Sequence, residues 1–356
     1  MKQFLLMSAA AAIAIAALAC ATAKPPAPTA WEQANPIEPL PAIPAGLDRS
    51  FAELKEPPTP ERARLGRWLF FDTRLSADGS ISCASCHRPE YGFSEPTPHS
   101  TGIRGQQGGR KAPAFTNQAR TLYPHFFWDG RAASLEEQAL GPVANPIEMG
   151  NTHDAMLQTL NGIAAYKPYF KEAFGTEEIT ADRVAKAIAD YERTCLSGDS
   201  AWDRWKKNRD ESAVTEEVKA GDSLFFGKAG CNQCHLGQNL TDSAFHNLGI
   251  GWDPVAKRFA DDGRYAVTKN DADRGAFKTP GLRDVALRAP YMHDGSVATL
   301  RETVDHYNKG GNPNPYLDPK VSKLNLSDAE ANAIVKFMEA LNSGLPVEKA
   351  PAAFPR

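Results

Sequence analysis

The sequence predicts a helical protein built from two domains that are related by internal duplication. Its length of 356 residues suits about two domains of 100 to 200 residues each, since larger single cores are uncommon. A short cysteine motif occurs twice, at residues 83–87 and 231–235, and the segments around its two copies resemble each other. One domain is therefore expected around each copy of the motif.

The composition is that of an ordinary soluble protein. Hydrophobic residues make up 42% and charged residues 23% of the chain, and the formal net charge is -3. These values argue against a membrane bundle and against a disordered chain. They also give no indication of a basic face, so no nucleic acid is expected as a partner.

The N-terminal segment predicts export to the periplasm. Lys2 precedes an apolar run over residues 4–19, which has the length of a signal-peptide core and is short for a membrane-spanning helix. A signal peptide is expected over residues 1–23. Cys20 also stands where a lipoprotein cysteine would be acylated, so contact with a membrane through a lipid anchor remains open. Residues 24–47 are rich in Pro and Ala and are predicted to form a tether.

The motif that occurs twice is C-x-x-C-H. Two thiols one helical turn apart can take both vinyl groups of a haem as thioethers, while the adjacent His reaches the iron. A redox C-x-x-C pair or a zinc site would not require a His directly after the second Cys. The sequence therefore predicts two covalently bound c-type haems. The residues expected to hold them are Cys83, Cys86 and the iron ligand His87 for haem 1, and Cys231, Cys234 and the iron ligand His235 for haem 2.

The flanking segments repeat in the same order in both halves. The matched pairs are residues 66–71 with 221–226, Lys111 with Lys278, and residues 128–135 with 293–300. The first pair reads as short helical pieces whose aromatic ends would pack on the haems. We therefore expect an N-terminal domain over residues 48–210, a C-terminal domain over residues 211–345 and a tail over residues 346–356. The seam is expected in the polar run 206–214.

Residues 180–195 are predicted to form a helix of the N-terminal domain. Val184, Ile188, Tyr191 and Cys195 recur there at spacings of four, three and four, which is the pattern of an apolar helical face. Cys195 is accordingly expected to be a buried small hydrophobic residue and not a haem or metal ligand.

Superposition of the two halves predicts that the two haems differ. Tyr307 follows His293 by fourteen residues, and Pro142 follows Trp128 by the same interval. A tyrosine can bind ferric iron through its phenolate oxygen, whereas proline offers no side-chain ligand. Haem 2 is therefore expected to be closed by Tyr307 and haem 1 to be open beside Pro142. A packing role for Tyr307 and iron ligation by His306 are the alternatives.

A polar run over residues 136–150 accompanies the open site. Glu148 in this run is the candidate to take a proton from one oxygen of hydrogen peroxide and return it to the other. Pro and Gly on both sides predict a rigid loop. The alternative is that Glu148 is a solvated surface residue.

These motifs together resemble the bacterial dihaem cytochrome c peroxidase and MauG family. The resemblance is carried by the two C-x-x-C-H motifs and by residues 127–131, 145–150 and 289–295, and it covers about residues 49–344. It implies an all-α periplasmic enzyme of two cytochrome c-like domains, of which the N-terminal one is peroxidatic and the C-terminal one transfers electrons. By the same resemblance, Glu148 and Gln138 are the distal acid/base pair and Trp128 relays electrons between the haems.

Three departures from the peroxidase branch of the family matter. Tyr307 stands where peroxidases have Met, and a phenolate stabilises ferric iron, which is the MauG-like arrangement. Ile103 stands where many peroxidases have a His that blocks the oxidised site, so an open site is expected, although His99 lies four residues away. Lys111 replaces an Asn that commonly helps to hold calcium between the domains, and an ammonium group cannot ligate a cation, so calcium is in doubt.

The predicted function is therefore reduction of hydrogen peroxide at haem 1 with electrons drawn through haem 2. MauG-like oxidation of a protein substrate is favoured because of Tyr307. The alternative is a cytochrome c peroxidase that takes electrons from a small c-type cytochrome or a cupredoxin. A plain electron-transfer cytochrome and a peroxide sensor are further alternatives, and no motif identifies the redox partner.

Overall fold

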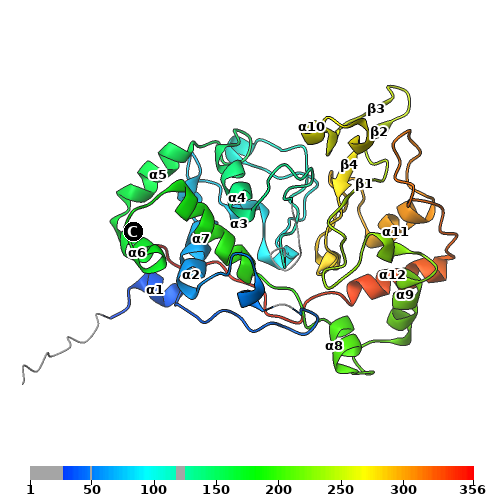
Figure 1. The fold of residues 1–356 in the computed structure, drawn as a ribbon, viewed down its shortest axis with the longest axis horizontal. Helices are drawn as coiled ribbons and strands as arrows, with labels where there is room; N and C mark the ends of the chain where they lie inside the picture. The colour runs from blue at the N-terminus through cyan, green and yellow to red at the C-terminus, as the bar shows by residue number, and fades with distance from the viewer. Residues whose placement is uncertain (1–26, 49, 118–124) are drawn as a thin grey trace, which may run out of the picture.

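The computed structural model describes residues 27–48, 50–117 and 125–356 (Figure 1). The predicted signal peptide and Cys20 lie outside the described residues. Within the described part of the chain, no helix combines the length and the apolar character needed to cross a membrane.

The described chain is mostly helical, as the sequence predicts, and the short strands of the C-terminal half are an addition to that prediction. The strands form two two-stranded antiparallel sheets, β1 with β4 and β2 with β3. The α-helices are α1 Ala30–Ala34, α2 Pro60–Phe71, α3 Cys83–Cys86, α4 Leu135–Ala144, α5 His153–Gly162, α6 Lys167–Phe174, α7 Ala181–Thr194, α8 Ala201–Asn208, α9 Glu216–Phe226, α10 Tyr265–Thr268, α11 Leu300–Asn308 and α12 Asp328–Glu339. The strands are β1 Phe245–Asn247, β2 Trp252–Asp253, β3 Arg258–Phe259 and β4 Ala276–Lys278.

The N-terminal core forms where α2 crosses α7. Thr59 caps α2 by accepting a hydrogen bond from the Arg62 N–H, and Pro60 occupies the first helical position, where a missing N–H costs nothing. Gly66 allows the close crossing, since a Cβ there would lie 1.8 Å from the carbonyl oxygen of Ala187. The fully buried side chains around the crossing include Leu65, Trp68, Leu69, Phe70, Ala187 and Ile188.

The C-terminal core forms around an equivalent crossing of α9 and α12. Gly221 allows this approach, since a Cβ there would lie 1.9 Å from the carbonyl oxygen of Ala333. Ser327 and Glu330 form a capping box at the start of α12. Gly66 and Gly221 are matched residues of the sequence repeat, so each half closes its core at the same matched glycine.

Helix α7 matches the sequence prediction closely. Thr180 is its N-cap and Cys195 its C-cap, so the helix occupies the predicted interval. Cys195 is 7% exposed, and its thiol donates to the carbonyl oxygen of Tyr191. Its predicted role as a buried small residue is confirmed.

Both terminal segments pack on the N-terminal half. The described part of the predicted tether is docked and not free, because Trp31 Nε1 donates to the Tyr169 hydroxyl at 2.7 Å and Asn35 Nδ2 donates to the Arg64 carbonyl at 3.0 Å. The predicted tail also returns to this half, where Arg74 donates to the Pro355 carbonyl at 3.0 Å. The C-terminus accordingly lies beside α6 (Figure 1).

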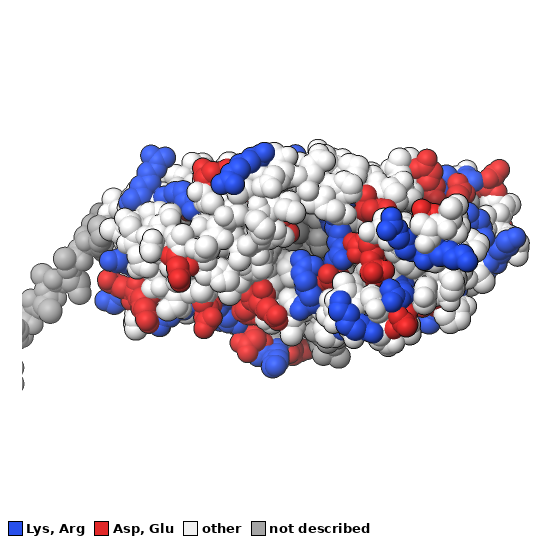
Figure 2. All heavy atoms as spheres, turned by 90° about the horizontal axis from the view of Figure 1, so that it is seen from above, with Lys and Arg blue, Asp and Glu red and all other residues white. Residues whose placement is uncertain are grey.

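Charged side chains are unevenly spread over the face seen from above (Figure 2). The middle of this face is a broad uncharged area, while basic and acidic side chains alternate over the C-terminal half at the right of the view. Deeper between the halves, Arg283 and Asp203 form a buried ion pair with a shortest distance of 2.7 Å.

Candidate active site

The first C-x-x-C-H motif is held on a single turn of helix. Cys83 and Cys86 begin and end α3, and His87 is its C-cap. The Nδ1 atom of His87 lies 3.1 Å from the carbonyl oxygen of Phe93, which can only accept a hydrogen bond. Nδ1 is therefore the protonated nitrogen, and Nε2 keeps its lone pair for a metal. Burial also lowers the pKa of His87, which favours the neutral ring that a ligand needs.

The second motif repeats this arrangement on a 3-10 turn. Cys231 begins the turn, and His235 follows it. The Nδ1 atom of His235 lies 2.9 Å from the carbonyl oxygen of Leu240, so its Nε2 is also free to bind a metal. Burial lowers the pKa of His235 as well. The two histidines are thus oriented by the same kind of contact, a carbonyl a few residues further along the chain.

Each motif faces a cavity that fits a c-type haem. A cavity of about 480 Å³ in the N-terminal half and one of about 200 Å³ in the C-terminal half are each lined by two thiols and a histidine of their motif. Paired thiols beside an oriented imidazole are the groups that c-type haem attachment requires. Trp128 lines both cavities and lies between them. The predicted residues of the first cavity are Cys83, Cys86, His87, Trp128, Gln138, Pro142 and Glu148; those of the second are Cys231, Cys234, His235 and Tyr307.

The segment that carries Gln138 and Pro142 is a helix, which corrects the prediction of a rigid loop over residues 136–150. Ser134 caps α4 by accepting a hydrogen bond from the Glu137 N–H. Pro142 lies in the last turn, where it removes a single helical hydrogen bond and the helix ends two residues later. Helical spacing puts Gln138 and Pro142 on the same face, one turn apart, toward the cavity. Only Glu148 follows the helix in an irregular turn.

Glu148 is half-buried and held by its neighbours. Asn145 Nδ2 donates to Glu148 Oε1 at 2.8 Å, and the Ile103 N–H donates to the Glu148 carbonyl at 2.9 Å. A Cβ at Gly102 would lie 1.9 Å from the Ile147 carbonyl, so only glycine permits this contact between the two loops. Burial raises the pKa of Glu148, against the opposing charge of Arg131 and the bond from Asn145. A carboxyl with a raised pKa is suited to exchange protons near neutral pH.

The side chain of Ile103 turns away from the cavity. It is 1% exposed and packs against Gly150, where a Cβ would lie 2.1 Å from Ile103 Cδ1. Neither Ile103 nor His99 lines the N-terminal cavity. The loop thus contributes backbone contacts to Glu148 in this conformation and places no imidazole in the pocket.

Tyr307 and Pro142 occupy equivalent helical positions. Tyr307 follows Leu300, the first residue of α11, by seven residues, and Pro142 follows Leu135, the first residue of α4, by seven. Tyr307 lines the C-terminal cavity. Burial, and after it the nearby thiols of the motif, raise the pKa of Tyr307.

The rival ligand His306 points elsewhere. Its Nε2 atom lies 3.0 Å from the Leu248 carbonyl, and the residue does not line the cavity. Two residues that the sequence did not suggest, Met292 and Met338, do line it. Their thioether groups carry no spacing signal that would have marked them.

Trp128 is fixed from both halves of the molecule. Its Nε1 donates to the Lys111 carbonyl at 2.8 Å, and its carbonyl accepts from the Lys278 N–H at 2.8 Å. Nearby, Arg110 joins Asp129 at 2.7 Å to Asp261 at 2.6 Å and so ties the N-terminal half to the C-terminal half. Sequence reasoning missed this bridge, because nothing local relates residues 110 and 261.

The side chain of Lys111 is buried among backbone carbonyls. The residue is 4% exposed, and its Nζ donates to the carbonyl oxygens of Glu95 and Thr97. Burial lowers the pKa of Lys111 to about 8, with the nearby carboxylate of Glu95 opposing this change. An ammonium group surrounded by carbonyl oxygens resembles a small cation in an oxygen-lined site.

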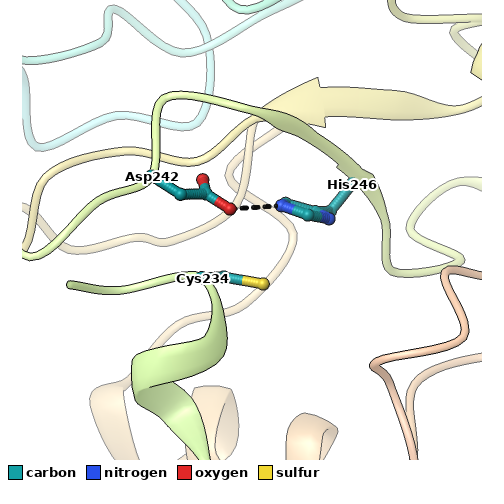
Figure 3. Close-up of side chains that lie close together, drawn as sticks. All are labelled: Cys234, Asp242 and His246. Atoms are coloured by element: carbon teal, nitrogen blue, oxygen red, sulfur yellow. Dashed lines mark hydrogen bonds and ion pairs between the residues drawn. The ribbon is translucent and has the colours of Figure 1, made fainter. Parts of the chain in front are cut away.

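A cluster of Cys234, Asp242 and His246 lies beside the second motif (Figure 3). His246 Nε2 lies 2.8 Å from Asp242, and its Nδ1 lies 2.6 Å from Asp318. The thiol of Cys234, then Asp318 and Asp242, raise the pKa of His246 to about 10. An imidazolium with both nitrogens donating to carboxylates has no lone pair for a metal, and thioether attachment would also occupy Cys234. His246, which lines the C-terminal cavity, therefore links Asp242 to Asp318 by hydrogen bonds.

Glu192 is a further cavity residue that the sequence analysis missed. It lines the N-terminal cavity from α7 and is 6% exposed. The sequence did contain an indication of this position. Glu192 lies one helical turn after Ile188, on the side of α7 that the apolar spacing predicts to be buried. Acidic residues are rarely buried, so an acidic residue on a buried helical face indicates a buried carboxyl group.

Comparison with known proteins identifies the family. A family model described as "Di-haem cytochrome c peroxidase" matches residues 60–211. The chain is 41% identical over 288 residues to the "Methylamine utilization protein MauG" of Methylorubrum extorquens, covering 81% of this chain and 80% of that protein. It is 37% identical over 317 residues to the "Cytochrome c551 peroxidase" of Nitrosomonas europaea, covering 89% and 87%.

A solved structure has the same fold. It is the crystal structure of "a MauG-like protein associated with microbial copper homeostasis", with a TM-score of 0.74, 30% identity and coverage of 87% of this chain and 94% of that one. The similarity covers most of both chains. This chain belongs to the di-haem cytochrome c peroxidase family, a family of oxidoreductase enzymes that includes the MauG proteins.

Proposed function

We propose that this protein is a periplasmic di-haem peroxidase that reduces hydrogen peroxide in its N-terminal cavity and oxidises a protein substrate in a MauG-like manner. One observation carries the proposal: Pro142 and Tyr307 occupy the same helical position and line one cavity each. Proline leaves the first cavity without a second protein ligand, whereas the phenol can close the second. The predicted signal peptide supports export, and lipidation at Cys20 remains a separate alternative.

Two haems would be held by the two motifs, and their irons supply peroxide binding and electron exchange. In the N-terminal cavity, His87 Nε2 would hold the iron, and Pro142 offers no side-chain ligand that would compete with the substrate. The Glu148 carboxylate then takes a proton from one peroxide oxygen and returns it to the other, which favours heterolysis of the O–O bond. Gln138, one turn before Pro142 on α4, is placed to orient the peroxide by hydrogen bonding.

The C-terminal cavity is suited to accept electrons from a protein. A phenolate from Tyr307 favours ferric iron, which is the MauG-like condition. Trp128 lines both cavities and is held by hydrogen bonds at its indole and at its carbonyl, so it is the proposed relay between them. A relay residue of this kind must be rigidly packed, because electron transfer depends steeply on distance.

A cytochrome c peroxidase that uses a small c-type cytochrome or a cupredoxin is the second candidate. Met292 and Met338 also line the C-terminal cavity, and a methionine ligand would raise the reduction potential of the haem there. Such a haem would accept electrons from a donor protein. Proteins named MauG and proteins named cytochrome c peroxidase are both among the relatives, so the family alone does not separate the two candidates.

We infer that the Lys111 ammonium takes the position of a calcium ion between the domains. Its contacts with the carbonyl oxygens of Glu95 and Thr97 support this role, since calcium in proteins takes carbonyl oxygens as ligands. The proposal predicts a protein that needs no calcium for the arrangement of its two halves.

We also propose that the two halves arose by duplication, with domains over residues 48–210 and 211–345. The matched crossings at Gly66 and Gly221 support this history. So do the two histidines of the motifs, which are oriented by equivalent carbonyl contacts.

The experiment that tests the function is addition of one equivalent of hydrogen peroxide to the fully ferric, haem-loaded protein. Visible and near-infrared absorption are followed. A rapid and long-lived spectral change without prior reduction is expected for the MauG-like enzyme. Reaction only after one haem has been reduced would favour the cytochrome c peroxidase and would renew the case for His99 as a blocking ligand.

A further inference from the structure

Glu192 is a buried carboxyl for which the proposed mechanism gives no use. Its Oε2 atom is inaccessible to solvent and has no hydrogen-bond partner among the described residues. The side chain nevertheless lines the same cavity as Glu148. A buried polar atom without a partner costs free energy, so its presence beside the active cavity calls for a function.

The surroundings of Glu192 favour its neutral form. Burial raises the pKa of Glu192 to about 8, and the neighbouring charge of Glu136 adds to this increase. Arg193 opposes it, but its guanidinium is engaged by Glu136 at 2.8 Å and by Asp190 at 3.0 Å. Cys83 of α3, a neighbouring group that interacts electrostatically with Glu192, becomes an uncharged thioether once haem is attached. Glu192 therefore carries a proton at neutral pH.

The stoichiometry of the reaction requires protons from outside the substrate. Each hydrogen peroxide takes up two electrons and two protons and leaves as two water molecules. The proton that Glu148 takes from one oxygen returns to the other, so this residue supplies neither of the two. The electrons come from the redox partner, and the protons must reach the cavity through other groups.

The other acidic residues of the cavity wall are already engaged. Its carboxyl groups within the described chain belong to Asp129, Glu148, Glu192 and Asp261. Arg110 binds Asp129 at 2.7 Å and Asp261 at 2.6 Å, and Arg131 binds Asp129 at 3.0 Å. The hydrogen bonds from Arg110 hold the pKa of Asp261 below its usual value, against the opposing effect of burial, and Asp129 is engaged by two arginines. The Lys111 ammonium is held by two carbonyl oxygens.

The geometry points to Glu192 as the proton donor that resupplies the N-terminal cavity during peroxide reduction. The inference rests on the proposed peroxidase function. Glu192 gives its proton toward the substrate oxygen, becomes a carboxylate, and takes a new proton from solvent.

The first test needs no activity. Infrared absorption of the fully haem-loaded protein is recorded as pH rises from neutral to alkaline. A carboxylic acid carbonyl band that titrates near the pKa of Glu192 is expected, and it should be absent from Glu192→Gln. Lack of such a band in the unmodified protein would overturn the proposal before any variant is made.

The second test separates proton supply from peroxide activation. Glu192→Gln should react normally with one equivalent of peroxide, but sustained turnover with ferrocyanide as electron donor should fall by about 100-fold with a larger solvent deuterium isotope effect. Glu192→Asp, which keeps a carboxyl, should recover most of the turnover. Asp182→Asn, an exposed acid on the same helix, should behave like the unmodified protein.

The outcomes are distinguishable from failure of the proposed function. No reaction of the unmodified protein with peroxide, oxidised or reduced, would reject the peroxidase itself. Normal turnover and an unchanged isotope effect in Glu192→Gln would reject Glu192 as the donor while leaving the peroxidase intact. If Glu192→Gln loads fewer than two haems, Glu192→Asp is used to test the role instead. Full turnover of Glu192→Asp at high pH, with the same isotope effect as the unmodified protein, would contradict Glu192 as the donor.

Discussion

The backbone N–H of Lys111 donates to the carbonyl oxygen of His293 at 2.8 Å, across the boundary between the two halves. The reverse contact is also made, because the Lys278 N–H donates to the Trp128 carbonyl at 2.8 Å. Lys111 matches Lys278 in the sequence repeat, and Trp128 matches His293. Each half thus gives the other the same hydrogen bond, as in an interface with two-fold symmetry.

This exchange explains why Trp128 lies between the cavities. A symmetric interface places matched residues on both sides of the axis, and here one of the pair is a tryptophan and the other a histidine. His293 stacks on Phe277, with ring centroids 3.5 Å apart, and lines only the C-terminal cavity. Trp128 lines both cavities, so the proposed relay is asymmetric because the two halves differ at this one matched position.

Glu148→Gln should keep both haems but slow the first reaction with peroxide by about 100-fold or more, because an amide cannot carry the proton between the two oxygens. Stopped-flow absorption with one equivalent of peroxide measures this rate. Glu177→Gln, at an exposed position, is the matched control and should react at the normal rate. An unchanged rate in Glu148→Gln would remove this residue from the mechanism.

Tyr307→Met should raise the reduction potential of the C-terminal haem, on the order of 100 mV or more, because a thioether stabilises ferrous iron relative to a phenolate. Spectroelectrochemical titration measures the potential. His306→Gln is the control and should leave it unchanged, since the His306 ring is engaged with the Leu248 carbonyl. A shift in the control but not in Tyr307→Met would make His306 the ligand.

If the Lys111 ammonium takes the position of a calcium ion, as proposed, the purified protein should contain two irons and no stoichiometric calcium per chain. Elemental analysis by mass spectrometry checks both metals. A chelator of calcium should leave the melting temperature unchanged. One tightly bound calcium per chain would contradict the proposed role of the Lys111 ammonium.

Glu192 should make the stability of the protein depend on pH. Burial raises its pKa from 4.5 to about 8 in the folded protein, so its contribution to stability is fully present below about pH 4.5 and is lost as pH rises through 8. The melting temperature of the haem-loaded protein should therefore fall more between pH 5 and pH 8 than that of Glu192→Gln. Parallel curves for the two proteins would show that the Glu192 pKa is not raised.

Gly66→Ala should destabilise the N-terminal half by roughly 1–3 kcal/mol, because the added methyl group would meet the Ala187 carbonyl and push α2 away from α7. Thermal unfolding of the haem-loaded protein measures the change. Gly162→Ala is the control, since a Cβ there meets nothing within 4 Å. Equal melting temperatures for the two variants would mean that the crossing can relax.

Several features of the site were predictable because they are local in sequence. The helix over residues 180–195 follows from the spacing of its apolar residues and from Thr180 at its start. The segment 136–150 was harder, because its Pro and Gly suggest a loop, while the Ser134 cap and the late position of Pro142 allow a helix. The local sequence there does not distinguish a loop from a helix. Packing of α4 against α7 stabilises the helix.

The sequence by itself predicted where each haem would attach and that the two sites would differ, because the C-x-x-C-H motif spans five residues and the repeat register relates Pro142 to Tyr307. Only the tertiary structure decided which distant residues share a cavity. Glu192 beside Glu148, Arg110 between Asp129 and Asp261, and Trp128 lining both cavities depend on contacts between segments far apart in the chain. Such contacts arise from the packing of whole helices and loops, which no short pattern in the sequence encodes.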